Sequence, residues 1–166
     1  MPLEPIEILT GTICLLFVII SIIVGLAIIS RYFKYKRTTF LLVGFTWIIM
    51  SEIWWSASIS FVVALFNGVG LTDQQYFFIG NLFVPLGIVA WMAAFTEMMF
   101  KEKRKVILTI FAIIAVLYYV IFMYLIFTDV NTIGTMRGIV DGDYTPTAMI
   151  FLLTGLFTFV ITGLMF

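Results

Sequence analysis

The hydrophobic pattern along the chain consists of five long apolar runs separated by short polar links. None of these runs alternates polar and apolar positions as the strands of a membrane barrel do. A helix needs about 20 apolar residues to cross the hydrocarbon core, and lipid offers the backbone no other hydrogen-bond partners. The pattern therefore predicts a single all-α domain over residues 1–166, a bundle of five transmembrane helices. The expected helices cover residues 6–30, 39–66, 76–100, 106–127 and 147–166.

The composition supports the same class of protein. Apolar residues make up 63% of the 166 residues and charged residues 11%, whereas soluble domains have about 45–50% apolar and about 25% charged residues. A water-soluble globule is therefore excluded. We expect an integral, multi-pass protein of the cell membrane, whose first partner is the lipid bilayer.

The distribution of basic residues predicts the orientation of the chain. All nine Lys and Arg residues except Arg137 lie in the links after the first and third helices. Short loops rich in Lys and Arg stay in the cytoplasm. We therefore expect the N-terminus outside, the C-terminus inside, and two cytoplasmic anchors. Their basic residues are Arg31, Lys34, Lys36, Arg37, Lys101, Lys103, Arg104 and Lys105.

Several kinds of chemistry are excluded by the residues that the sequence lacks. It contains no histidine, and its single cysteine, Cys14, lies inside an apolar run. Histidine-dependent nucleophiles, the usual zinc sites and paired redox cysteines are therefore excluded. The acidic turn at Asp141 and Asp143 lacks the spacing of a calcium loop. We expect no enzyme activity, cofactor or metal, and no nucleic acid as a partner.

One acidic residue, Glu52, lies midway along the second apolar run. An ionisable group near the bilayer centre costs about 2.5–3.5 kcal/mol, so it has to face protein or water, be paired, or be neutral. Ser56 and Ser60 follow at helical spacing on the same face, and Trp55 lies beside them. The stripe predicts a buried site for a proton, a cation or a polar ligand. The alternative is an acid that hydrogen-bonds a neighbouring helix and holds its register.

The third helix carries a proline and an asparagine that could complete this site. Pro85 lacks an N–H group and clashes with the carbonyl of the residue four positions earlier, which is Asn81. A kink at Pro85 is therefore expected. Asn81 would reach Glu52 only through a bent helix or a water molecule. A proline kink with a locally satisfied asparagine is the alternative interpretation.

The remaining polar positions of the helices indicate packing. Thr154, Thr158 and Thr162 repeat every four residues beside Gly155, and small residues at this spacing let helices approach closely. Further helices or other membrane subunits are candidate partners for this face of the last helix. Glu97 precedes Lys101 by four residues, which predicts an ion pair between them at the membrane interface.

Part of the chain resembles the N-terminal membrane sensor region of archaeal and bacterial histidine kinases, a seven-helix module. The resemblance covers residues 41–105, less than half of the chain. It consists of Trp47 in an apolar helix, a short polar loop, the run Phe78-Ile79-Gly80, Pro85 and the basic cluster at 101–105. The present chain has five expected helices and no kinase domain. The resemblance implies a truncated or stand-alone relative that binds a signal or a partner.

These observations favour a non-enzymatic membrane sensor or ligand-binding domain. Its expected ligand-binding residues are Glu52, Trp55, Ser56, Ser60 and Asn81. One alternative is a small structural subunit of a larger membrane complex. Another is a proton- or cation-coupled transporter built around Glu52.

Overall fold

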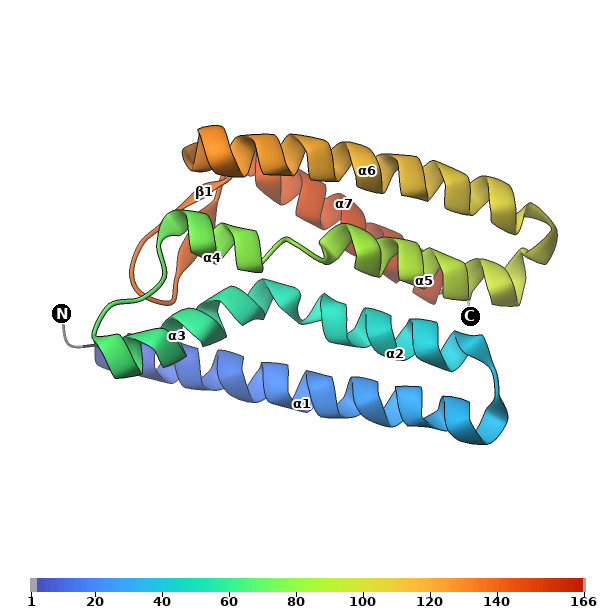
Figure 1. Cartoon of the computed structure of the whole chain (residues 1–166), viewed down its shortest axis with the longest axis horizontal. Coiled ribbons are helices and arrows are strands. Elements are labelled where there is room, and N and C mark those ends of the chain that lie inside the picture. The colour runs from blue at the N-terminus through green and yellow to red at the C-terminus, as the bar shows by residue number, and fades with distance from the viewer. Residues whose placement is uncertain (1–2, 166) are drawn as a thin grey trace.

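The structure, a computed structural model, describes residues 3–165. Figure 1 shows the helices running side by side along the long axis of the molecule, with α1 at one edge and α6 at the other. A β-hairpin covers one end. The elements are α1 (Pro5–Tyr35), α2 (Thr38–Met50), η1 (Glu52–Trp54), α3 (Trp55–Asn67), α4 (Asp73–Ile79), α5 (Val84–Met99), η2 (Lys101–Lys103), α6 (Arg104–Thr128), η3 (Val130–Thr132), β1 (Gly134–Met136), β2 (Gly142–Tyr144) and α7 (Pro146–Gly163).

The prediction of five long apolar helices is confirmed. The described residues contain five helical stretches long and apolar enough to cross a membrane. Together with the composition, they indicate a multi-pass membrane protein built as a helical bundle. The helix ends fall close to the expected ones. Residues 1, 2 and 166, which the predicted domain includes, lie outside the described range.

The second stretch is not the uninterrupted helix that its apolar run predicts. The α-helical hydrogen-bond ladder ends at Met50, continues as the 3-10 turn η1, and resumes at Trp55. The hydroxyl group of Ser51 donates to the carbonyl of Ile48 at 2.7 Å, and serine side chains compete in this way with the backbone ladder. The break places Glu52 in a tight turn in the middle of the bundle.

The third stretch is broken more severely than a kink at Pro85 would require. Helix α4 ends at Ile79, and α5 begins only at Val84, with Pro85 in its first turn. Proline is tolerated there because the first N–H groups of a helix have no partner within it. Asn81 therefore lies in the linker between two helices. The expectation that Asn81 and Pro85 share one turn of a bent helix is wrong.

The link before the last helix contains the only strands among the described residues, which the all-α prediction did not include. Strands β1 and β2 pair antiparallel, with Gly134 opposite Tyr144 and Met136 opposite Gly142. Arg137 and Asp143 form an ion pair within the hairpin. Two strands of three residues are too short to leave a periodic signal in the sequence.

The helices differ in how closely they pack. A Cβ atom on Gly44 of α2 would lie 2.7 Å from the carbonyl oxygen of Gly25 on α1, so the two backbones nearly touch. An apolar core beside the hairpin includes Phe77 of α4 together with Phe122 and Ile126 of α6. Helix α7 packs mainly on α5. The bundle therefore has a tight α1–α2 pair and a loosely attached last helix.

Candidate ligand-binding site

The breaks of the second and third apolar stretches meet in the interior of the bundle. Oε1 of Glu52 accepts a hydrogen bond from the backbone N–H of Phe83 at 2.6 Å. The backbone N–H groups of Leu82 and Val84 also interact with this carboxyl group. Glu52 is completely buried, with 0% of its surface exposed. Its side chain therefore caps the helix that begins at Val84.

Helix α5 needs such a cap because it begins in the interior of the bundle, next to the completely buried Glu52. The first N–H groups of a helix have no partner within it, and the aligned peptide dipoles make this end positive. Phe83, at the N-cap, offers no side-chain oxygen, so the carboxyl group of Glu52 takes this part from a neighbouring helix. Oε2 is buried and has no hydrogen-bond partner among residues 3–165.

Two of the predicted site residues are held by their own helix. The indole Nε1 of Trp55 donates to the hydroxyl group of Ser51 at 2.9 Å. The hydroxyl group of Ser56 donates to the carbonyl of Ile53 at 3.3 Å and is fully buried. The ring of Trp55 also lies edge-on to Phe83, with 6.1 Å between centroids. Trp55 and Ser56 therefore hydrogen-bond to residues of the break between α2 and α3.

Ser60 serves a different part of the molecule. Its hydroxyl group donates to the carbonyl of Ile139 in the hairpin and accepts from the backbone N–H of Leu71 at 3.0 Å. On the other side of the hairpin, Oε1 of Glu7 accepts from the N–H of Ile139 at 2.8 Å. Ser60 and Glu7 therefore attach the hairpin to α3 and α1. The predicted polar stripe divides between the helix break and the hairpin.

Asn81 faces a residue that the sequence analysis did not single out. Its Nδ2 atom donates to the carbonyl of Phe77 at 2.8 Å and to the hydroxyl oxygen of Tyr144 at 3.1 Å. No hydrogen bond joins Asn81 to Glu52 within the described part of the chain. Asn81 and Tyr144 thus form one polar neighbourhood beside the linker that precedes α5.

Tyr144 remains a hydrogen-bond donor at physiological pH. Burial raises the pKa of its phenol to about 12, although the hydrogen bond from Asn81 lowers it. Tyr144 ends strand β2, two residues before α7 begins. No local pattern marks this position, because the hairpin that turns Tyr144 inward is itself a tertiary feature.

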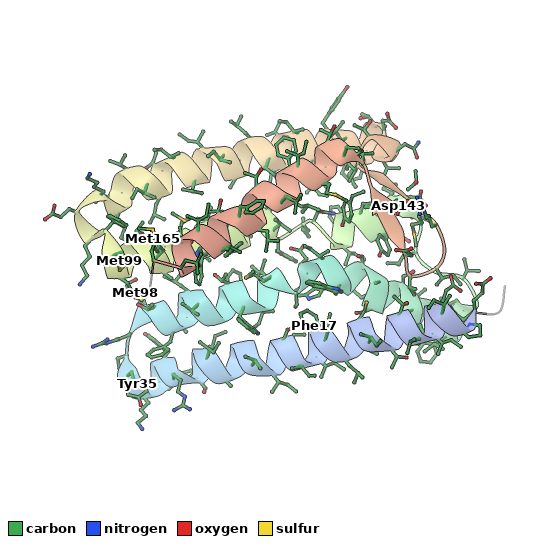
Figure 2. The ribbon with its side chains drawn as sticks, turned by 180° about the vertical axis from the view of Figure 1, so that it is seen from behind. Phe17, Tyr35, Met98, Met99, Asp143 and Met165 are labelled. Carbon is green, nitrogen blue, oxygen red and sulfur yellow. The ribbon has the colours of Figure 1, made fainter. Side chains whose placement is uncertain are left out.

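A cavity of about 470 Å³ lies next to this neighbourhood, between α1, α2, α5 and α7. Its lining is almost entirely apolar, and the hydroxyl-bearing side chains in it are Ser21, Ser51 and Tyr144. Figure 2 views the molecule from the side on which α7 lies in front of α5, with Phe17 of the lining about midway along α1. A volume of this size is typical of pockets for small molecules.

The predicted ligand-binding residues are not themselves lining residues of this cavity. Asn81 lines a second, smaller cavity of about 80 Å³ beside α6. Glu52 adjoins the larger cavity through its neighbour Ser51, and its partner Phe83 adjoins it through Val84. The acid is therefore next to a lining residue in the chain but is not itself part of the lining. The sequence indicated the acid, but the cavity depends on how α7 packs.

The end of the bundle opposite the hairpin joins the two basic links. Glu97 accepts from the hydroxyl group of Thr38 at 2.8 Å and forms an ion pair with Arg104 at 3.6 Å. The predicted partner Lys101 is replaced by Arg104, because α5 ends at Met99 and Lys101 lies in the following 3-10 turn, outside the helix that the i, i+4 spacing requires. Within residues 3–165 no group of three or more acidic, cysteine or histidine side chains could hold a metal ion.

Comparison of the chain with protein-family models, with characterised proteins and with solved structures found no match in any of the three. The class that the fold and the site define is therefore a helical membrane protein with five apolar helices, two of them broken at a shared buried acid.

Proposed function

We propose that this chain is a non-enzymatic membrane domain that senses its surroundings by binding a small apolar molecule between α1, α2, α5 and α7. The observation that supports this proposal most directly is the cavity of about 470 Å³ beside the buried Glu52. Four helices and the hairpin contribute to its lining, so an occupant would change how α7 sits on the remaining bundle. Such a change is a means of passing a signal along the membrane protein.

The chemistry of the lining favours a ligand that is dissolved in the bilayer. Trp47, Trp54 and Phe17 line one side, and Leu156 with Phe159 lines the other. A polar, water-soluble ligand would lose its hydration there without regaining hydrogen bonds, at a cost of several kcal/mol. A molecule with a single alkyl or isoprenoid chain would bury apolar surface and could enter sideways from the lipid.

We further propose that the chain lies in the cell membrane with its N-terminus outside and its C-terminus in the cytoplasm. The distribution of basic residues supports this orientation, because every Lys and Arg except Arg137 lies at one end of the bundle. The hairpin and the entrance to α7 would then face the exterior. The two basic links would contact the anionic lipids of the inner leaflet.

A photoreactive probe tests the binding proposal. The chain is reconstituted in lipid nanodiscs with a dodecyl chain that carries a diazirine, and labelled peptides are identified by mass spectrometry. We expect saturable labelling at both Met50 and Met149, which line the cavity from α2 and α7. Unlabelled dodecane should compete with it. Labelling of Ile20, which is 58% exposed on α1, should rise linearly with probe and resist competition.

A matched pair of variants on α7 provides the control. Leu156→Trp fills the cavity and should abolish saturable labelling, whereas Ile161→Trp, at a position that is 60% exposed and not in the lining, should leave it unchanged. Labelling that is non-saturable at every position in the wild-type protein would overturn the proposal.

A second candidate function is that of a small subunit in a larger membrane complex. Only 11% of the most apolar window of α6 and 6% of that of α7 is buried within the structure. Helices with so little burial leave wide faces for other helices. Extraction from the native membrane at a fixed ratio to other polypeptides would favour this function over a self-contained binding domain.

A proton- or cation-coupled transporter is the third candidate. Broken helices that meet near the membrane midplane are a recurrent feature of transporter sites, and Glu52 lies at such a junction. If the protein is such a transporter, it should carry protons or cations across the membrane of sealed liposomes. The Glu52→Gln variant should then fold but no longer transport them.

A further inference from the structure

Three side chains in the lining of the cavity of about 470 Å³ carry a hydroxyl group, and they differ in how far these groups are already hydrogen-bonded. The hydroxyl group of Ser51 donates one hydrogen bond and accepts another. The hydroxyl oxygen of Tyr144 accepts a hydrogen bond from Asn81. Of the three, only Ser21 on α1 has no hydrogen-bond partner within residues 3–165.

The unpaired hydroxyl group of Ser21 differs from other hydroxyl groups in the helices of this chain. Those of Thr12, Ser58 and Thr154 each donate to the carbonyl four residues earlier, as serine and threonine can do inside a helix. Ser21 is only 5% exposed. Its oxygen is not enclosed on all sides, as the unpaired Oγ1 atom of Thr46 is, and Ser21 lines the cavity. The hydroxyl group of Ser21 is therefore open to a ligand in the cavity.

The position of Ser21 along α1 restricts what this ligand can be. Ser21 lies close to the middle of α1, so in a membrane it falls near the centre of a hydrocarbon core that is about 30 Å thick. The lining contains no charged side chain. A charged head group would lose its water there at a cost of several kcal/mol. The atom that meets Ser21 therefore belongs to an uncharged molecule dissolved in the lipid.

A carbonyl group is the uncharged partner that suits a single hydroxyl group best. The hydroxyl group of Ser21 can donate to a carbonyl oxygen, and a carbonyl has no donor of its own. If the ligand were an alcohol, one of the two O–H protons would lack an acceptor, and an unpaired polar group in an interior costs about 1–3 kcal/mol. We propose that the ligand of this cavity is a lipid-dissolved carbonyl compound whose carbonyl oxygen accepts a hydrogen bond from Ser21. This inference rests on the proposed function of apolar ligand binding.

Three competitors with the same carbon skeleton test this inference against the diazirine probe in nanodiscs, with concentrations expressed per lipid. Tridecane has no polar atom, 7-tridecanone has a carbonyl group in the middle of its chain, and 7-tridecanol has a hydroxyl group there. The lining on α7 extends from Met149 to Phe159, roughly 15 Å along a helix, which suits chains of this length. We expect the ketone to bind about three- to tenfold more tightly than tridecane. The alcohol should bind less tightly than the ketone.

A pair of variants on α1 assigns the preference to Ser21. Ser21→Ala removes only the hydroxyl group and should bring the ketone-to-tridecane affinity ratio close to one. Alanine is the best helix former, so this variant should fold. The matched control Ser30→Ala removes an exposed hydroxyl group that donates to Ala27, and it should keep the ratio.

Infrared spectroscopy of the bound ketone gives a second readout. With 7-tridecanone labelled with carbon-13 at the carbonyl, a hydrogen bond from Ser21 should shift the carbonyl stretching band to lower frequency than in lipid alone. The shift should be absent in Ser21→Ala and present in Ser30→Ala.

The outcomes separate this inference from the proposed function. Saturable binding of all three competitors with equal affinity would overturn the carbonyl proposal and leave the apolar binding domain in place. A preference for the ketone that persists in Ser21→Ala would overturn the role of Ser21. Absence of saturable binding by any competitor would overturn both the inference and the proposed function.

Discussion

Glu52 and Phe83 are 31 residues apart in the chain, yet the carboxyl group of the first caps the helix that follows the second, with 2.6 Å between Oε1 and the backbone nitrogen. The contact joins two helix breaks that neither residue could stabilise alone. An acid in a membrane helix usually marks a site of function. Here the acid also has a structural role, because it caps α5. Substitutions of Glu52 can separate this capping role from a functional one.

The capping role predicts that removing the acceptor is more damaging than removing the acidity. Glu52→Leu would leave the N–H of Phe83 unpaired in the interior and should lower the free energy of unfolding by about 2 kcal/mol. Glu52→Gln retains an acceptor and should lose less than about 1 kcal/mol. Equilibrium unfolding in mixed micelles measures both. Glu102→Gln, in the exposed link, is the control and should have no effect. Equal losses for Leu and Gln would contradict the capping role.

The close approach of α1 and α2 predicts a penalty for adding a single methyl group. The Cβ atom of Gly44→Ala would meet the carbonyl oxygen of Gly25 at 2.7 Å, so the helices have to separate. Overpacking of this kind costs about 1–3 kcal/mol. Gly163→Ala is the matched control on α7, where the nearest atom lies 4.0 Å away. Thermal unfolding in nanodiscs should show a lower midpoint for Gly44→Ala alone.

Because Ser60 attaches the hairpin to α3, removing its hydroxyl group should lower the stability of the hairpin region and leave the stability of the remaining bundle unchanged. Ser60→Ala removes the hydroxyl group that holds both Leu71 and Ile139. Hydrogen exchange of the Leu71 amide should accelerate by about tenfold, the change expected for losing about 1.4 kcal/mol of local stability. Exchange within α1 and α2 should not change. Ser30→Ala, at an exposed hydroxyl that bonds only Ala27, is the control. Unchanged exchange at Leu71 would show that the hairpin is held by other contacts.

The proposed orientation predicts which end of the bundle reacts with impermeant reagents. Cys14 is the single cysteine of the sequence and is buried, so Cys14→Ala provides a clean background. In intact cells, a membrane-impermeant maleimide should label Asp141→Cys in the exposed hairpin. It should label Lys103→Cys, in the basic link, only after permeabilisation. The reverse pattern would show that the chain is inserted the other way.

The helix count could be predicted because it depends on a property that every membrane helix shares. In lipid, the backbone N–H and C=O groups of each apolar run have to form hydrogen bonds within that run, so the length of the run alone predicts a spanning helix. The breaks were harder to foresee. Pro85 indicated a disturbance of the third helix, but the four residues without helix before Val84 depend on Glu52 arriving from another helix to cap the new end.

Only part of the site could be predicted from the sequence. Glu52 was found because a carboxyl group is expensive within an apolar run. Its partners were not, because backbone N–H groups carry no residue identity that a sequence pattern could reveal. Tyr144 was missed because it lies in a loop rich in acidic and small residues, and only the pairing of β1 with β2 turns it towards Asn81.

The sequence by itself determined that this protein is a bundle of five apolar helices with one costly acid at its centre, because hydrophobicity and helix length are local quantities. The tertiary structure alone decided that the acid caps a second broken helix, that a hairpin brings Tyr144 to Asn81, and that α7 leaves a cavity with Tyr144 in its lining. Each of these depends on contacts between residues far apart in the chain. No local pattern encodes the distance between two helices, and that distance decides whether a polar stripe becomes a binding site.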